Sequence, residues 1–227
     1  MNNNSNKFPV NDVYASIQGE GCLAGTPMIL LRLQGCGVGC PFCDTKQTWH
    51  LDSYHERNTI AEVLGANVLY TYRSPTEIAY YLHNQFKGVK WVLLTGGEPA
   101  QFHLAPLVAA IHDAGFKVAI ETSGTETGHI DANLDWICVS PKIKMPGGKQ
   151  VLPEAVEQAD EVKYVVGKAT DIQTFERFLE GVTLKESAQI CLQPMSQSKK
   201  ATELCIQTVL EKGWRLSIQT HKLLNLP

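Results

Sequence analysis

The sequence predicts an α/β protein built as a partial (β/α) barrel, with about six or seven mostly parallel strands. Short apolar runs alternate with amphipathic segments along most of the chain, which is typical of repeated right-handed βαβ units. The chain has 227 residues, which suits one single domain but is shorter than the roughly 250 residues of a complete eight-stranded barrel. We therefore expect a barrel that is smaller or more open than the complete form.

The N-terminal part begins with a polar segment, residues 1–9, which we expect to be disordered. The first predicted strand covers residues 28–35, where the apolar run "MILLRL" leads straight into a cysteine-rich loop. Residues 50–72 show no regular period and are interpreted as a possible insertion. The first predicted strand therefore ends at the cysteine-rich loop.

A helix is predicted over residues 74–86, because Ser74, Pro75 and Glu77 form the capping-box pattern of a helix N-terminus. The alternation then continues to the end of the chain. Further strands are predicted over residues 91–99, 116–124, 136–142, 161–167, 190–196 and 214–220, and further helices over 104–115, 154–159, 171–180 and 199–212.

Polar, glycine-rich or cysteine-rich residues follow each predicted strand. In parallel sheets ligands bind at the carboxyl ends of the strands, so these residues predict one binding site at a shared rim. They are residues 36–43, 95–99, 121–124, 140–142, 193–196 and 219–221.

Composition and charge exclude several classes of function. A hydrophobic fraction of 44% with 19% charged residues indicates a globular chain with a proper core. The net charge of −3 offers no basic surface for nucleic acid. No apolar run approaches the roughly 20 residues of a membrane span, and the N-terminus lacks the layout of a signal peptide. We therefore expect a cytoplasmic protein without a membrane or nucleic-acid partner.

Three cysteines, Cys36, Cys40 and Cys43, lie within eight residues. Thiolates are soft ligands that suit zinc, copper(I) or iron–sulfur clusters, and a structural zinc site would need a fourth ligand. Three thiolates suit a [4Fe–4S] cluster with one open iron. A structural zinc or thiol-redox module remains an alternative, which a colourless zinc-loaded protein would support.

The other four cysteines lie in or beside apolar segments and are interpreted as buried thiols. They are Cys22, Cys138, Cys191 and Cys205. Cys22 also lies close to the polar sequence "QGEG", which keeps a role in a site open for it.

The cysteine spacing, with Phe42 just before Cys43, resembles the signature of the radical S-adenosylmethionine superfamily. The sequence "TGGEP" at residues 95–99 resembles its second motif. The resemblance implies that superfamily's partial barrel, a [4Fe–4S] cluster, and S-adenosylmethionine as the ligand that completes the open iron. It also implies cleavage of that cofactor to a 5′-deoxyadenosyl radical.

Further motifs resemble one family within the superfamily, the 7-carboxy-7-deazaguanine synthases. They are "SIQGEG" (16–21), "RLQGC" (32–36), "CDTK" (43–46), "IETSGT" (120–125), "VSPK" (139–142), "QPMS" (193–196) and "QTHKLLNLP" (219–227). This resemblance implies a lyase that contracts the ring of 6-carboxy-5,6,7,8-tetrahydropterin with loss of ammonia, in queuosine and 7-deazapurine biosynthesis.

The resemblance also assigns residues to roles, with no catalytic side chain because the cofactor radical carries the chemistry. The cluster ligands are Cys36, Cys40 and Cys43, and the Mg²⁺ ligand is Thr45. The cofactor-binding residues are Phe42, Cys43, Asp44, Gly97, Glu98, Ser140, Pro141, Lys142, Gln193, Pro194, Met195 and Ser196. The substrate-binding residues are Ile17, Gln18, Gly19, Arg32, Thr95, Glu121, His221 and Pro227.

Arg32 has an independent physical rationale, because a guanidinium can grip the substrate's carboxylate through two hydrogen bonds. The guanidine-like edge of a pterin instead requires an acceptor, for which Glu121 and the α-carboxylate of Pro227 are candidates. His221 follows the last predicted strand, and it either contacts the substrate or hydrogen-bonds the chain terminus.

The resemblance implies a homodimer and an electron donor of the flavodoxin or ferredoxin type. The alternative is an activating enzyme that installs a glycyl radical on a partner protein, since such enzymes share the cysteine spacing. That function would not need Arg32, Thr45 or a structured C-terminus.

Overall fold

The computed structural model describes residues 6–226, which contain nine strands and six α-helices. The strands are β1 (Phe8–Ile17), β2 (Pro27–Leu33), β3 (Thr71–Arg73), β4 (Trp91–Gly96), β5 (Lys117–Thr122), β6 (Trp136–Val139), β7 (Glu161–Val166), β8 (Gln189–Pro194) and β9 (Arg215–Leu216). The helices are α1 (Pro75–Gln85), α2 (Ala105–Asp113), α3 (Pro153–Glu157), α4 (Ala169–Leu179), α5 (Lys199–Lys212) and α6 (Thr220–Leu224).

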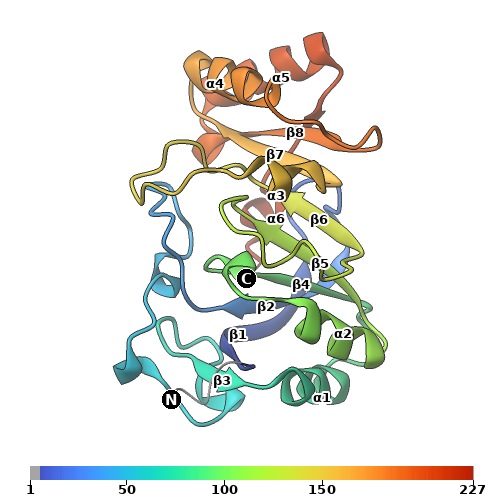
Figure 1. Cartoon of the computed structure of the whole chain (residues 1–227). Helices are drawn as coiled ribbons and strands as arrows, with labels where there is room; N and C mark the ends of the chain where they lie inside the picture. Colours follow the sequence, from blue (N-terminus) through green and yellow to red (C-terminus); the bar gives the residue numbers. More distant parts are fainter. Residues whose placement is uncertain (1–5, 227) are drawn as a thin grey trace.

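All nine strands form one sheet with the order β3-β1-β2-β4-β5-β6-β7-β8-β9. Neighbours from β2 through β9 pair in parallel, whereas β1 pairs antiparallel with both β2 and β3. The sheet curves, and α1, α2, α4 and α5 lie along its outer side (Figure 1). The predicted fold class, a partial barrel with mostly parallel strands, is confirmed, and all seven predicted strands are present.

Successive side chains of β4 point to opposite faces of the sheet. Val92 and Leu94 are fully buried in the main core between sheet and helices. Leu93 and Thr95 point the other way and line the interior of the partial barrel. Because side chains alternate along a strand, the inward positions are the ones available for a binding site.

The predicted capping box at the start of α1 is also present. Ser74 Oγ accepts a hydrogen bond from the Glu77 amide, and the Glu77 carboxylate accepts one from the Ser74 amide at 2.8 Å. Both partners thereby satisfy backbone donors that a helix N-terminus leaves unpaired.

The expected disorder of residues 1–9 is wrong at Phe8 and Pro9, which belong to β1. Phe8 is only 3% exposed and packs edge-on against Phe102. Residues 1–5 lie outside the described residues. Proline lacks only the backbone N–H donor, so Pro9 can lie in the strand. The Pro9 carbonyl still accepts a hydrogen bond from the Gln34 amide at 2.8 Å.

The sequence did not predict β1, because this strand contains Asn11 and Asp12, residue types that are depleted in strands. Asn11 lies at a register shift between Val10 and Asp12, where its buried side-chain amide donates to the carbonyls of Asn67 and Leu69. The irregular segment 50–72 is thus tied to the edge of the sheet. Its interpretation as an insertion stays a prediction.

No helix among residues 6–226 combines the length and the apolar character needed to span a bilayer.

Replacing Phe8 by Ala is expected to lower the free energy of unfolding by about 3 kcal/mol or more, because it leaves a cavity beside Phe102. Lys7→Ala, at an exposed position next to it, is the control and should change stability by less than about 0.5 kcal/mol. Denaturant unfolding followed by circular dichroism measures both. Equal stability of Phe8→Ala and the control would contradict the placement of Phe8 in the core.

Candidate functional site

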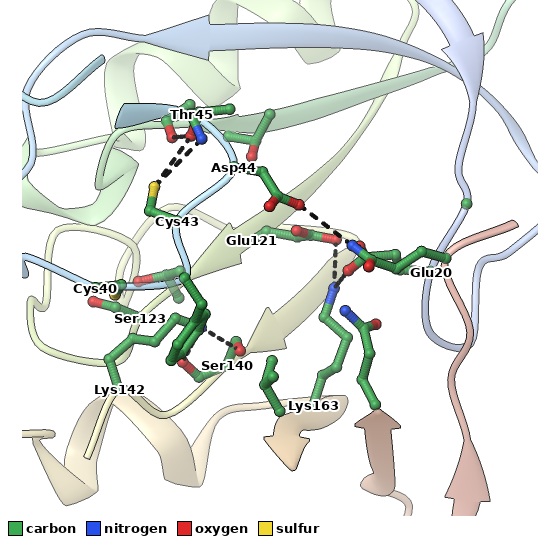
Figure 2. A pocket seen from close by; sticks show the side chains of 18 of the residues that line it. Glu20, Cys40, Cys43, Asp44, Thr45, Glu121, Ser123, Ser140, Lys142 and Lys163 are labelled. Atoms are coloured by element: carbon green, nitrogen blue, oxygen red, sulfur yellow. Dashed lines mark hydrogen bonds and ion pairs between the residues drawn. The ribbon is translucent and has the colours of Figure 1, made fainter. Parts of the chain in front are cut away.

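A cavity of about 330 Å³ lies at the carboxyl ends of the parallel strands, inside the partial barrel. Its walls come from the loops after β1, β2, β4, β5, β6 and β8 and from the C-terminal segment around α6. Figure 2 shows these side chains converging from both sides of the cavity. The location is the rim at which sequence reasoning expected a site.

The structure brings most of the predicted site residues together. Those that line the cavity are Ile17, Gln18, Gly19, Arg32, Cys36, Cys40, Phe42, Cys43, Asp44, Thr45, Thr95, Gly97, Glu98, Glu121, Ser140, Lys142, Gln193, Pro194, Met195, Ser196 and His221. Pro141 instead lines an adjoining cavity of about 210 Å³. Pro227 lies outside the described residues. The role of each residue toward a ligand stays a prediction.

The cysteine loop begins where β2 ends and is fixed to the turn that follows it. The amides of Gly35 and Cys36 donate to the carbonyls of Thr48 and Trp49 at 2.7 and 3.0 Å. The Cys43 sulfur accepts from the Trp49 indole N–H at 3.4 Å. Donors aimed at a sulfur favour its thiolate and tune an iron–sulfur cluster, so the loop suits cluster binding.

A second segment, residues 143–149, packs against this loop. Gly39 has a φ of +72°, and a Cβ added to it would approach the Gly147 amide nitrogen to 3.0 Å. Gly147 in turn donates to the carbonyl of Val38 at 3.0 Å, and Lys149 forms an ion pair with Glu126. Glycine at position 39 therefore allows the two segments to make close contact.

The donor set fits a [4Fe–4S] cluster. Three thiols of one preformed loop line a single cavity, and other residues of that cavity can hold a ligand for the fourth iron. Burial raises the pKa of the Cys40 thiol to about 11, and the nearby Lys142 ammonium opposes that rise. A bound metal supplies the stronger positive charge that holds such a thiol as thiolate.

Glu98 of the "TGGEP" sequence holds two strand ends together. Its side chain is 2% exposed, and one oxygen accepts from the Ala100 amide and the Thr122 hydroxyl at 2.9 and 2.6 Å. The other oxygen accepts from the Ser123 amide at 2.7 Å. Because these donors already use its carboxylate, any cofactor ammonium would have to share it with them.

Gly97 is the point of closest approach between β4's end and the cysteine loop. A Cβ added there would lie 2.0 Å from the Gly35 carbonyl oxygen, which no side chain can occupy. The Gly35 carbonyl also accepts from the Glu98 amide at 2.8 Å. The second motif is therefore built directly onto the cysteine loop.

Arg32 lies in β2 beside Thr95 of β4 and is held by Tyr14 of β1. Its Nε and Nη2 atoms donate to the Tyr14 hydroxyl at 3.2 and 2.8 Å. A guanidinium has five N–H donors, so this anchor leaves donors for an anionic ligand in the cavity. The anchor also fixes the plane in which they point.

A buried ionic network of Lys163, Glu20 and Glu121 forms another part of the cavity lining (Figure 2). Lys163, 4% exposed, donates from Nζ to Glu20 at 2.6 Å and to Glu121 at 3.1 Å. Gln18 also donates to the Glu121 carboxylate, at 3.0 Å. Burial raises the pKa of Glu20, but attraction to Lys163 and hydrogen bonds from Lys163 and Gln219 outweigh it and bring that pKa to about 2. Glu20 therefore remains ionised at neutral pH.

The C-terminal segment lies across the loop after β1. The Thr220 amide and hydroxyl donate to the Gly19 carbonyl at 2.9 and 3.0 Å. A Cβ on Gly19 would meet His221 Nδ1 at 2.2 Å, so His221 packs flat on that glycine. Lys222 donates to Asp44 at 3.0 Å, which links the segment to the cysteine loop. His221 thus both lines the cavity and contacts the polar loop.

Sequence reasoning missed Lys163 and Trp49 as cavity residues, whereas Gln219 belongs to the predicted rim segment 219–221. Lys163 carried a signal, since it is a charged residue among the apolar residues 162–166. Trp49 carried none, because its contacts depend on how the chain folds back on the cysteine loop.

Comparison with known proteins agrees with this geometry. A family model described as the Radical SAM superfamily matches residues 30–184. The 7-carboxy-7-deazaguanine synthase of Escherichia coli (strain K12) is 40% identical, covering 97% of this chain and 99% of that protein. The synthase of the same name from Synechocystis sp. is 31% identical over 96% of this chain and 93% of its own length. The crystal structure of QueE from Escherichia coli superposes with a TM-score of 0.87 at 37% identity, over 94% of each chain.

Replacing Lys163 by Met is expected to destabilise the fold by about 3 kcal/mol at neutral pH, because Glu20 and Glu121 lose a buried partner. The folded pKa of Glu20 lies below its usual 4.5, so the stability it contributes is complete above about pH 4.5 and is lost as the pH falls toward 2. The difference between the two proteins should therefore shrink below about pH 4.5.

Denaturant unfolding at neutral and acidic pH measures this difference. The control is Lys212→Met, which removes an exposed ion pair with Glu176 and should change stability by less than about 1 kcal/mol. A loss for Lys163→Met that is no larger than the control's, or one that does not depend on pH, would contradict the buried network.

Proposed function

The chain belongs to the radical SAM superfamily and, within it, to the 7-carboxy-7-deazaguanine synthase family, and we propose that it forms 7-carboxy-7-deazaguanine from 6-carboxy-5,6,7,8-tetrahydropterin. The reaction is a ring contraction with loss of ammonia, and it serves queuosine and 7-deazapurine biosynthesis. The observation that carries the proposal is that one cavity is lined by the three-cysteine loop, by Arg32 and by Glu121. A radical source and a receptor for a carboxylated, guanidine-like molecule thus share one space.

The [4Fe–4S] cluster is assigned to Cys36, Cys40 and Cys43. Once bound there, the reduced cluster and S-adenosylmethionine would supply the radical chemistry, hydrogen abstraction at C6 of the substrate. The chain's own residues bind and orient both molecules and exclude water. The residues proposed to hold S-adenosylmethionine are Phe42, Cys43, Asp44, Gly97, Glu98, Ser140, Pro141, Lys142, Gln193, Pro194, Met195 and Ser196, among which Gly97 supports close backbone approach.

The substrate carboxylate is assigned to Arg32, whose guanidinium is already oriented by Tyr14. The guanidine-like edge is assigned to Glu121, which Lys163 and Gln18 hold in place through one of its oxygens. These two charged groups have opposite sign and belong to different strands, β2 and β5, so they accept the substrate in one orientation. The residues proposed to complete the substrate site are Ile17, Gln18, Gly19, Thr95, His221 and Pro227.

Mg²⁺ is assigned to Thr45. Its hydroxyl donates its proton to the Gly96 carbonyl at 3.1 Å, which leaves the oxygen lone pairs for a cation. A hydroxyl, a substrate carboxylate oxygen and waters form the oxygen-rich, partly hydrated set that Mg²⁺ prefers. The ion would join the substrate to the cysteine loop and act as an electrostatic template.

Reduction of the cluster requires a one-electron donor, for which we propose a flavodoxin or ferredoxin. We further propose a homodimer and a cytoplasmic location, both in keeping with the family. The alternative of a glycyl-radical activating enzyme is not favoured, because the relatives share the synthase name over nearly the full length of this chain.

The direct test incubates anaerobically reconstituted, reduced protein with S-adenosylmethionine, Mg²⁺ and 6-carboxy-5,6,7,8-tetrahydropterin. We expect 7-carboxy-7-deazaguanine and 5′-deoxyadenosine by mass spectrometry, and a lower rate when Mg²⁺ is chelated. Cys40→Ser should lose both cluster and product, whereas Cys205→Ser, buried in α5, should keep them. Cofactor cleavage without the deazaguanine would contradict the substrate, and turnover by Cys40→Ser would contradict the ligand assignment.

Replacing Arg32 by Ala should raise the KM for the pterin roughly 30-fold, since about 2 kcal/mol of charge-assisted hydrogen bonding is lost. Tyr14→Phe keeps the guanidinium but removes its anchor, so a smaller rise of roughly threefold is expected. Steady-state kinetics measures both. An unchanged KM for Arg32→Ala would contradict its contact with the substrate carboxylate.

A further inference from the structure

A second group of sulfur and carboxylate ligands lies outside the cavity. Cys22 belongs to the loop between β1 and β2, Glu161 begins β7, and Cys191 is the third residue of β8. One ligand atom of each lies within 4.8 Å of the other two. None of these three residues lines the cavity described above, so the cluster is separate from the proposed active site.

The two sulfur atoms are spaced as ligands of one metal ion. Cys22 Sγ and Cys191 Sγ lie 3.6 Å apart. Two thiolates bound about 2.3 Å from a tetrahedral zinc ion lie about 3.8 Å from each other, so little movement is needed to bind the ion. A disulfide would instead require the sulfurs to approach to about 2.05 Å. The distance therefore favours a shared ion over a covalent bond.

Glu161 supplies an independent observation. Its side chain is 2% exposed, and its Oε2 atom accepts from the Cys22 amide at 2.9 Å. Its Oε1 atom is buried and has no hydrogen-bond partner among the described residues. A buried carboxylate oxygen without a partner is unfavourable by a few kcal/mol, and a cation is the group that would remove this penalty.

We propose that Cys22, Glu161 and Cys191 form a structural zinc site. Two thiolates and a carboxylate are a donor set that zinc accepts, and the hydrogen bond from the Cys22 amide would orient the carboxylate toward the ion. A water molecule takes the fourth position and completes the tetrahedral geometry. The dication balances most of the charge that the three ligands would otherwise bury.

The site would fasten the loop that presents substrate-facing residues. Cys22 lies two residues after Glu20, and the same loop carries Gln18 and Gly19 into the cavity. The loop is already held by the ion pair of Glu20 with Lys163 and by the Gly21 amide, which donates to the Ser217 hydroxyl at 2.8 Å. A zinc ion bound by Cys22, Glu161 and Cys191 would add a further link from this loop to β7 and β8. Its role is therefore to position the loop rather than to take part in the chemistry.

Metal analysis of the holoenzyme tests the proposal. The chain is reconstituted anaerobically with iron and sulfide, incubated with zinc, passed over a weak chelating resin, and measured by mass spectrometry of the elements. We expect about one zinc per chain beside the roughly four iron atoms of the cluster. Cys22→Ser and Glu161→Gln should each lower retained zinc at least tenfold and leave the iron unchanged. Cys205→Ser, a buried cysteine in α5, is the matched control and should retain both metals.

Three outcomes would overturn the proposal. Absence of zinc from the unmodified chain would do so, as would zinc retained by Cys22→Ser, which would place the ion elsewhere. The third is a mass loss of two hydrogens with a cross-link between the Cys22 and Cys191 peptides in protein kept anaerobic, which would identify a disulfide instead. Iron content shows independently of zinc whether a variant has folded. If one variant loses both metals, it has failed to fold, and the zinc content of the other variant then decides the outcome.

Discussion

The parallel pairing of β2 with β4 is the constraint on which the rest of the site depends. Its register places Arg32 beside Thr95 and makes both strands leave the sheet at the same level. The cysteine loop and the "TGGEP" loop then run side by side, joined by the hydrogen bond from the Glu98 amide to the Gly35 carbonyl. A shift of this register by one residue would turn Arg32 away from the cavity, because side chains alternate along a strand.

Charged side chains also fix the arrangement of the cavity. Two carboxylates, Glu20 and Glu121, face one space, and ionised neighbours of like charge would repel each other without a cation between them. Lys163 provides that cation from β7, which β6 separates from the Glu121 strand β5, and it is shielded from water. Because its hydrogen bonds fix the carboxylates before any ligand arrives, the recognition surface is preorganised and less conformational freedom is lost on binding.

The sequence allowed the parallel part of the fold to be predicted, since β2 and the strands from β4 to β9 were each marked by an apolar run with a polar end. It did not reveal β1, where Asn11 is accommodated only by carbonyls from a segment more than 50 residues away. Within the site, too, some residues could be predicted from a local pattern and others could not. Cys36, Cys40 and Cys43 are neighbours in sequence and could be recognised by spacing, whereas Lys163 of β7 pairs with Glu20 from the loop after β1 and Glu121 from β5. Interactions between distant residues have no local pattern by which to be found.

The proposed zinc site also depends on residues that are far apart in the sequence. Cys22 and Cys191 are 169 residues apart, and only the curvature of the sheet brings the loop after β1 close to β8. A metal ion that binds these residues in the folded chain, and not in the unfolded one, adds its binding free energy to the stability of the fold. A metal that joins these two residues would therefore stabilise the fold where the curved sheet has no strand to close it. The loop that carries Gln18, Gly19 and Glu20 would gain most from it, because that loop has no strand neighbour of its own.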